Sequence, residues 1–365
     1  MSADRVLAIQ AALRASDLEL LALVPGPNLF YATGAALHAS ERESLLFIPR
    51  EGDPFALVPV LEAPSLRPLG IPLYEWRDEE GPEAELARLI ARHGLAGRRL
   101  GVEAEQMRYR SVARLRALAP SLTLQPADDL LGSLRARKTP GEIAAIRRAI
   151  EVTEQGLRRT IEAIAAGQTE REVAAALQIN LLRAGADGMA FGPLVVSGPR
   201  SAEAHGGAGE RALQPGDMII IDCGATVGHY SGDITRCVAI EPLPDELAAI
   251  HDLCRRANRA GREAVRPGAS GADVDRAARR VIDGAGYGQY FVHRTGHGLG
   301  LEIHEPPYIN QNNPEPLAEG NVFTIEPGIY LPGLGGVRVE DNLVVTADGG
   351  QSLTTFPREL IRIDA

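Results

Sequence analysis

The chain has 365 residues, of which 45% are hydrophobic, 24% charged and 4% aromatic, a composition typical of globular proteins and not of disordered chains, coiled coils or disulfide scaffolds. At roughly 150 residues per domain, this length favours about two domains. The formal net charge of −10 repels phosphate backbones and anionic lipids, so neither nucleic acid nor a membrane surface is an expected partner.

Alternating helix-like and strand-like patterns cover the first 130 residues. Helical patterns span 5–15 and 83–92, and strand-like apolar runs span 18–24, 45–49, 55–60 and 99–103. Alternation of this kind predicts an α/β domain around a central sheet. No glycine-rich phosphate loop follows any of these strands, so we expect the chemistry to lie further along the chain.

A second unit begins with a strong helix start. Thr139, Pro140 and Glu142 form a capping box with proline at the first helical position. Isoleucine and leucine then recur at helical spacing, at Ile143, Ile146, Ile150, Leu157, Ile161 and Ile164. We therefore expect an N-terminal α/β domain over residues 1–132 and a second domain over residues 133–365.

The second domain contains a weak internal repeat with an offset of 101 residues. Residues 167–173 are echoed by 268–274, and the helices that follow are expected to end at Gly185 and Gly286. Each helix starts with an N-cap pair, Thr169 with Glu172 and Ser270 with Asp273. The repeat predicts a duplicated helix–helix–strand unit whose two halves pack face to face.

Four acids lie next to apolar strands, where an unpaired charge is very costly. Asp222 ends one strand and Asp233 follows across an expected hairpin, while Glu326 and Glu340 hold the equivalent places in the second half. If a pseudo-twofold axis relates the halves, these carboxylates converge, and two divalent cations would balance their charge. Taken singly, each acid also fits a structural ion pair or a turn cap, as Asp233 near Arg236 illustrates. The duplicated pattern favours the metal site.

Three histidines, His293, His297 and His304, lie among glycines, where the backbone can approach a ligand closely. Carboxylates with one or two imidazoles and no cysteine favour manganese, cobalt or zinc in a catalytic site over a structural zinc centre. We expect two divalent ions, with Mn²⁺ preferred to Co²⁺ or Zn²⁺.

The chain resembles the prolidase/aminopeptidase P family through motifs that match in type, order and spacing. The motifs are DCG at 222–224, YSGDITR at 230–236, HRTGHGLG at 293–300, EIHEPP at 302–307, TIEPG at 324–328 and GGVRVED at 335–341. The resemblance is strong over 134–362 and less specific in the first 130 residues, where NLFYATG at 28–34 carries it. Two departures are Gly232, where the family often has serine, and Glu203, which replaces a commonly apolar residue.

The resemblance implies an α+β pita-bread catalytic domain, built from the duplicated halves. It implies two metals held by Asp222, Asp233, His297, Glu326 and Glu340, with Asp233 and Glu340 bridging them.

The same resemblance, with the residues around the motifs, suggests a set of substrate and catalytic groups. The expected substrate residues are His205, His293, His304, Tyr230, Arg338 and His38. Glu326 is the expected base for the attacking water, and His205 and His304 are expected to donate hydrogen bonds to the developing oxyanion. Arg338 is either an anion clamp for the substrate or a support for the metal site near Glu340.

On this resemblance we expect an Xaa-Pro metallopeptidase that cuts the bond between an N-terminal residue and a following proline. Proline has no N–H and a locked φ, so general peptidases bind it badly. The motifs do not separate a dipeptidase from an aminopeptidase, and we favour a dipeptidase acting on small peptides. The alternatives are a metal-less pita-bread binding module, a creatinase-type hydrolase and a methionine aminopeptidase-like enzyme. The complete ligand set argues against the first two, and the N-terminal domain argues against the third.

In related homodimers the N-terminal domain of one subunit packs beside the catalytic cleft of the other. We therefore expect a homodimer in which residues 33–43, with His38, cover the partner's pocket, and a solvated loop is the alternative.

The cysteines favour a reducing compartment. Cys223, Cys237 and Cys254 are odd in number and contain no Cys-x-x-Cys pair, which indicates reduced thiols. The start of the chain lacks the apolar core of a signal peptide, and no apolar run approaches the ~18 residues that span a bilayer. We expect a cytoplasmic protein.

Overall fold

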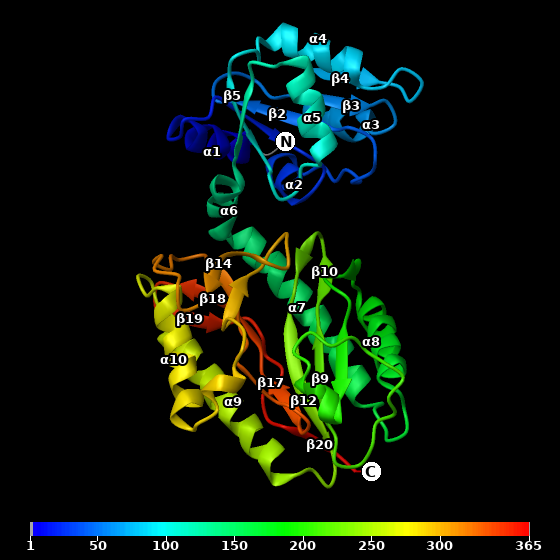
Figure 1. Cartoon of the computed structure of the whole chain (residues 1–365), viewed down its shortest axis with the longest axis vertical. Coiled ribbons are helices and arrows are strands. Elements are labelled where there is room, and N and C mark those ends of the chain that lie inside the picture. Colours follow the sequence, from blue (N-terminus) through cyan, green and yellow to red (C-terminus); the bar gives the residue numbers. More distant parts are fainter. Residues whose placement is uncertain (1–2, 365) are drawn as a thin grey trace. The chain divides into compact units, whose positions relative to one another are not determined.

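The computed structural model describes residues 3–364 and divides the chain into two compact units, residues 1–135 and 136–365 (Figure 1). The boundary expected from the sequence, after residue 132, lies just before this division.

The first unit is built on one six-stranded mixed sheet in the order β4-β3-β2-β1-β5-β6. Its strands are β1 (Leu20–Leu23), β2 (Leu45–Pro49), β3 (Phe55–Pro59), β4 (Leu73–Trp76), β5 (Arg99–Val102) and β6 (Thr123–Pro126). Its helices are α1 (Ala3–Arg14), α2 (Pro27–Thr33), α3 (Ala63–Leu66), α4 (Glu83–His93), α5 (Tyr109–Leu118) and α6 (Asp128–Ala136), with a 3₁₀ turn at Arg67–Leu69.

The expected α/β architecture of this unit is confirmed. Strands β1, β2 and β3 are buried along their whole length, which explains why they read as continuous apolar runs. Some of the side chains of these three strands form a single core with Leu86 and Leu89 of α4 and Leu115 of α5. The sequence pattern missed β4 and β6. Residues of β6 are half-buried or exposed, so it carries no apolar run to detect.

The second unit holds four long helices and fourteen strands among the described residues. Its helices are α7 (Pro140–Ile161), α8 (Glu170–Ala184), α9 (Asp245–Ala264) and α10 (Gly271–Gly284), with 3₁₀ turns at Gly198–Ala202 and Gly288–Tyr290. Its first strands are β7 (Gly188–Met189), β8 (Leu194–Ser197), β9 (Met218–Cys223), β10 (Ala225–Val227), β11 (Tyr230–Ser231) and β12 (Ile234–Ile240). The others are β13 (Gly296–Gly298), β14 (Glu305–Ile309), β15 (Val322–Ile325), β16 (Gly328–Leu331), β17 (Gly335–Arg338), β18 (Asp341–Thr346), β19 (Gly349–Ser352) and β20 (Ile361–Ile363).

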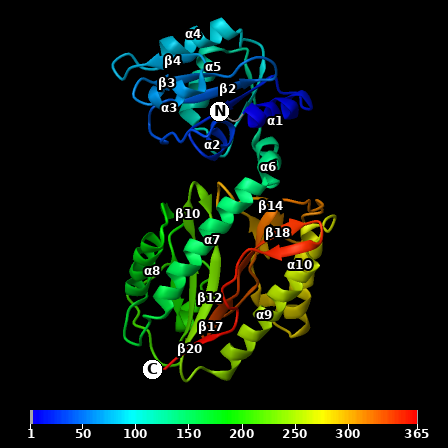
Figure 2. The same cartoon turned by 180° about the vertical axis from the view of Figure 1, so that it is seen from behind.

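The predicted duplication is visible in the fold of this unit. Helices α7 and α8 pack together beside the sheet β20-β12-β9-β8, and α9 and α10 pack together beside the sheet β14-β13-β15-β18-β19 (Figure 1). From behind, α7 crosses the strands of the first half (Figure 2), packing against β10, β11 and β12.

Matching backbone hydrogen bonds relate the starts of α8 and α10. Gly167 N donates to Leu213 O, and Gly268 N donates to Leu317 O, each over 2.8 Å. All three predicted capping boxes are present, at α7, α8 and α10. Helix α8 ends at Ala184 and is capped by the expected Gly185, whereas α10 ends at Gly284 and is capped by Ala285, one residue before the predicted Gly286.

Two antiparallel strand pairs set the positions of the acids. In the pair β9–β12, Thr235 lies opposite Asp222. In the pair β15–β18, Ile325 lies opposite Asp341, so Glu326 and Glu340 leave the paired strands side by side. Two strands from each half thus bring their ends to one region.

Within residues 3–364, no helix combines the length and the apolar character that a membrane crossing requires.

Candidate metal centre

A cavity of about 590 Å³ lies in the second unit and receives residues from both of its halves. It is lined by Phe191, Gly192, Pro193, Leu194, Ala204, His205, Gly206, Gly207, Asp222, Asp233, His293, Arg294, His297, Ile303, His304, Glu326, Arg338 and Glu340. The volume falls within the usual ~300–1,000 Å³ of small-molecule sites. Every residue that the sequence suggested for the site is here except Tyr230 and His38.

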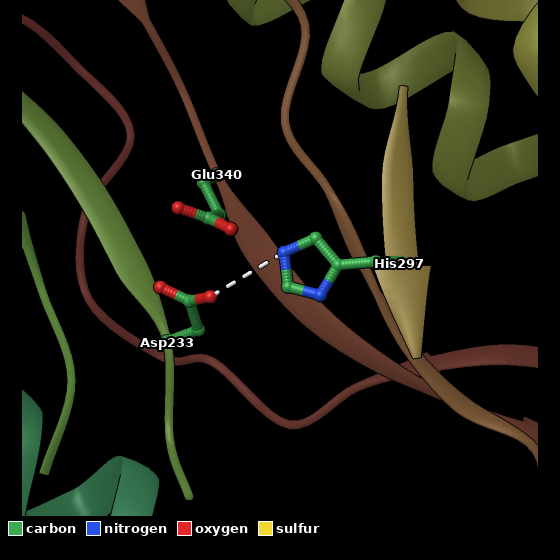
Figure 3. A group of neighbouring side chains, drawn as sticks. All are labelled: Asp233, His297 and Glu340. Carbon is green, nitrogen blue, oxygen red and sulfur yellow. Dashed lines mark ion pairs between the residues drawn. The ribbon is translucent and has the colours of Figure 1, made fainter. Parts of the chain in front are cut away.

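Asp233, His297 and Glu340 form the tightest group in the cavity (Figure 3). Each offers one ligand atom, and these atoms lie within 4.8 Å of one another. Asp233 precedes β12, His297 lies in β13, and Glu340 connects β17 to β18. All three side chains are buried, so the group is enclosed by the strand ends and not spread over the surface.

Asp222 and Glu326 flank this group. The Nε2 atom of His297 lies 3.4 Å from Glu326 Oε1 and 3.6 Å from Asp233 Oδ2, longer than a normal hydrogen bond. The Oδ1 atoms of Asp222 and Asp233 are buried and have no hydrogen-bond partner among the described residues. Unpartnered buried carboxylate oxygens are costly, and a divalent cation is the partner that four carboxylates and one imidazole suit.

Burial and mutual repulsion shift the pKa values of these groups strongly. Loss of solvent and the nearby carboxylates raise the pKa of Asp233 and Glu340 well above the ordinary range. Burial raises the pKa of Glu326 to about 7, opposed by the charge of Arg338 and reinforced by that of Asp222. Burial, with His304 nearby, lowers the pKa of His297 to about 3 and keeps its imidazole neutral, the form that binds metals.

Two threonines and an arginine hold the carboxylates in place. Thr235 Oγ1 donates to Glu340 Oε2 over 2.6 Å and accepts from Arg338 Nε over 3.0 Å. A second guanidinium nitrogen of Arg338 donates to Asp222 Oδ2 over 2.6 Å. Thr324 Oγ1 accepts from the backbone N–H of His297 and donates to Glu326 Oε1 over 3.3 Å. Arg338 thus donates both to Asp222 and to the threonine that donates to Glu340.

Tyr330 and Asn258 complete this support. The Tyr330 hydroxyl accepts from Arg338 over 2.8 Å and lies 2.8 Å from His293 Nε2. Asn258 Nδ2 donates to the carbonyls of Ile325 and Val339, the residues before Glu326 and Glu340, at 2.9 and 3.3 Å. Sequence reasoning missed these side chains because their partners lie many residues away along the chain.

The other predicted histidines differ in exposure. His293 is half-buried, whereas His205 and His304 are exposed. The rings of His297 and His304 meet edge to face with centroids 4.2 Å apart. His205 and His304 therefore combine exposure to solvent with a place in the lining of the cavity.

Tyr230 and His38 are not brought to this cavity. The Tyr230 hydroxyl donates to Glu142 Oε1 over 3.1 Å, at the start of α7. His38 is an exposed residue of the first unit.

Glycines flank His297 for a reason that the sequence did not indicate. A Cβ on Gly296 would lie 1.8 Å from the carbonyl oxygen of Thr324, and a Cβ on Gly298 would lie 2.4 Å from that of Glu305. Strand β13 therefore approaches β15 and β14 too closely for any side chain at these positions. Strand packing, and not the approach of a ligand, accounts for the two glycines.

Behind His304, the only lysine of the chain forms a buried ion pair. Lys138 Nζ lies 2.9 Å from Glu305 Oε1, and the two side chains are 2% and 1% exposed. Glu305 Oε2 also accepts from the backbone N–H of Glu302 over 3.2 Å. This pair anchors the turn that carries His304.

Two similar halves that enclose four carboxylates and a neutral imidazole define a metal-dependent hydrolase of the pita-bread class. Comparison with known proteins makes the assignment specific. Residues 144–347 match the model of metallopeptidase family M24, and residues 5–137 match that of the creatinase/prolidase N-terminal domain. The chain belongs to the prolidase/aminopeptidase P group of the M24 metallopeptidases, which confirms the family and fold expected from its motifs.

Similar proteins match this chain from end to end. A dipeptidase structure from Pyrococcus horikoshii has a TM-score of 0.94 and 38% identity, covering 98% of this chain and 100% of that one. An Xaa-Pro dipeptidase from the same organism is 34% identical over 351 residues, covering 95% of both chains. An X-Pro aminopeptidase structure from Thermotoga maritima has a TM-score of 0.85 and 31% identity, covering 97% of this chain and 100% of that one. The fold is thus shared by proteins named for either activity.

Proposed function

We propose that this chain is a two-metal Xaa-Pro dipeptidase, which hydrolyses the bond between an N-terminal residue and a following proline. The observation that carries the proposal is the buried group of Asp233, His297 and Glu340, with Asp222 and Glu326 in the same cavity. We place the chemistry in residues 133–365 and leave no catalytic group to residues 1–132. The names of the similar dipeptidases support the substrate class.

The proposed metal ligands are Asp222, Asp233, His297, Glu326 and Glu340, with Asp233 and Glu340 shared between two ions. We propose Mn²⁺ as the native metal, with Co²⁺ and Zn²⁺ as substitutes, because the donors are mostly carboxylate oxygens. When bound, such ions polarise the substrate carbonyl and lower the pKa of a bound water to about 7.

The side chains around the ligands have separate roles in the proposal. Glu326 accepts the proton of the attacking water, since its carboxylate lies beside His297 within the cavity. His205 and His304 donate hydrogen bonds to the oxyanion from the exposed side of the cluster, since an imidazole carries at least one N–H donor. His293, fixed by Tyr330, forms part of the substrate wall.

Arg294 supports a dipeptide as the preferred substrate. Two arginines line the cavity, and the donors of Arg338 already bind Asp222, Thr235 and Tyr330. The guanidinium of Arg294 lies over the ring of Tyr308, 4.7 Å from its centroid, at the cavity wall. A guanidinium in this position matches the free α-carboxylate of the proline in an Xaa-Pro dipeptide. A longer peptide carries a neutral amide there.

The decisive experiment compares three substrates with chelated and metal-refilled enzyme. Hydrolysis of Ala-Pro with refilled metal, with little action on Ala-Pro-Ala or Ala-Ala, supports the dipeptidase. Faster cleavage of Ala-Pro-Ala would identify an aminopeptidase, and cleavage of Ala-Ala a peptidase without proline specificity. Equal activity with and without metal, or none with any metal, would refute the proposal.

We also propose a homodimer in the cytoplasm. Three buried cysteines without a disulfide support a reducing compartment. The exposed His38 supports a contact made by residues 33–43 with the cavity of a second subunit. Mixing a His38→Ala protein with an Asp222→Ala protein, each impaired alone, should restore part of the activity if the loop acts across the interface. A monomer in solution, or a His38→Ala enzyme identical to wild type, would contradict this assembly.

A further inference from the structure

A second cavity, of about 190 Å³, lies between α9 and the segment that leads into β20. Helix α9 and strand β20 are labelled in Figure 2. Its lining consists of Arg255, Arg256, Arg259, Arg262, Pro357, Arg358 and Glu359. The four α9 arginines occupy positions i, i+1, i+4 and i+7, which lie along one side of a helix. None of these residues takes part in the metal centre.

Positive charge exceeds negative charge at this cavity. The five lining arginines and Arg236 behind them have four carboxylates within ion-pair distance, those of Asp252, Glu263, Asp341 and Glu359. The C-terminal end of α9 contributes only about half a negative charge. More than one positive charge is left over, in a chain whose formal net charge is −10.

Two of the arginines are held in place from behind. Arg358 Nε donates to Asp341 Oδ2 over 2.5 Å, and its Nη2 donates to Ser352 Oγ over 3.0 Å. Arg262 Nε donates to Asn258 Oδ1 over 2.8 Å. Their side chains are 22% and 24% exposed, so they lose little freedom when a ligand binds.

The two held guanidiniums repel each other. Burial and the charge of Arg358 lower the pKa of Arg262 from its ordinary value. Asp341, fully buried, is shared by Arg236, Arg262 and Arg358. An additional anion in the cavity would relieve this repulsion.

We propose that this cavity is a binding site for one phosphate group, either inorganic phosphate or the phosphate of a small metabolite. Planar guanidiniums bind the oxygens of phosphate in a bidentate manner, and several of them converge here. At roughly 30 Å³ per water, the cavity holds about six waters, enough for one phosphate group but not for a nucleotide.

The test measures phosphate binding to the metal-loaded enzyme by equilibrium dialysis at constant ionic strength, with chloride replacing phosphate in the reference. The test variant is Arg256→Gln with Arg259→Gln, whose side chains are 52% and 63% exposed and whose loss should not disturb folding. The matched control is Arg148→Gln with Arg276→Gln, two exposed helical arginines in similar ion pairs elsewhere. Because phosphate also binds metal ions, only the component that the test variant loses is assigned to the cavity.

We expect one saturable site per chain, with affinity for phosphate at least about tenfold weaker in the test variant and unchanged in the control. Phosphoserine and inorganic phosphate, compared in separate arms, distinguish a metabolite phosphate from the free anion, and tighter binding of either one supports the site. Equal affinity in the test variant and wild type would overturn the proposal, as would absence of saturable binding. Binding of a short DNA duplex without binding of phosphate would also overturn it, in favour of a nucleic-acid surface.

Discussion

Removing the metals should make the stability of the second unit fall as pH rises above neutrality. The folded, metal-free site holds Glu326 with a pKa of about 7, against an ordinary value of 4.5. At neutral pH the folded state therefore binds protons that the unfolded state has released. Stability contributed by such a group is complete below pH 4.5 and is lost as pH rises through 7.

In the metal-free protein, deprotonation of Glu326 alone should lower the free energy of unfolding by about 1 kcal/mol between pH ~6.5 and ~8.5. Asp233 and Glu340, whose pKa values are also raised, each add up to about 1.4 kcal/mol per pH unit while they titrate. Below pH 6.5, His293 and His297 act in the opposite sense. Burial lowers their pKa values to about 3. Between pH 6.5 and 3 these histidines therefore bind protons in the unfolded state but not in the folded state. The informative window therefore lies above pH 6.5.

The assay is urea unfolding of chelated and metal-loaded protein at three pH values in that window, followed by far-UV circular dichroism. Bound cations keep the carboxylates ionised, so the loss should disappear in the loaded form. The only tryptophan, Trp76, is buried in β4 of the first unit, and its fluorescence provides an internal control that should not follow the effect. Glu326→Gln should remove its share of the slope.

Two results would refute this reasoning. One is a metal-free stability that stays constant or rises between pH ~6.5 and ~8.5. The other is the same slope in the chelated and loaded forms. Calorimetry in buffers of different ionisation enthalpy provides a second measurement, because metal binding near neutral pH should release protons.

Three further predictions concern single side chains. Asp233→Asn and Glu340→Gln should each lower the bound metal, measured by mass spectrometry, and abolish Ala-Pro hydrolysis; near-normal turnover with two metals bound would show that the ligands are misassigned. His304→Ala should keep its metal and lose about 10²–10³-fold in kcat, the effect of one oxyanion donor; loss of metal would place His304 among the ligands instead. Lys138→Met should lower the free energy of unfolding by roughly 3–5 kcal/mol, because it removes the cation that lies 2.9 Å from the buried carboxylate of Glu305. Adding Glu305→Gln should recover much of that loss, and no recovery would contradict an ion-pair explanation.

Local patterns predicted the parts of this molecule that depend on neighbouring residues. The capping boxes at Thr139, Thr169 and Ser270 involve side chains three residues apart, so the sequence alone reveals them. The acids at strand ends were recognisable because Asp222 and Glu326 interrupt apolar runs at equivalent places in a repeat. Their meeting in one cavity follows from the duplication.

The supporting contacts could not be predicted in the same way. Thr235 binds Glu340 across 105 residues, and Arg338 reaches Asp222 across 116. Nothing near Thr235 in the sequence distinguishes it from any other strand threonine. Tyr230 belongs to the motif that carries Asp233, yet its hydroxyl donates to Glu142 Oε1, a contact across 88 residues that the motif does not indicate.

The buried position of Lys138 makes this chain unusual as a target for lysine-specific proteolysis. Such an endoprotease has a single site in the sequence, after Lys138, close to the division between the two compact units. In the folded protein that residue is paired with Glu305, and its backbone N–H donates to the carbonyl of Gly320. Cleavage there must wait for the segment to open, so its rate, measured against urea, reports the local opening free energy. The same cut yields two fragments, residues 1–138 and 139–365, divided three residues beyond the boundary between the two compact units.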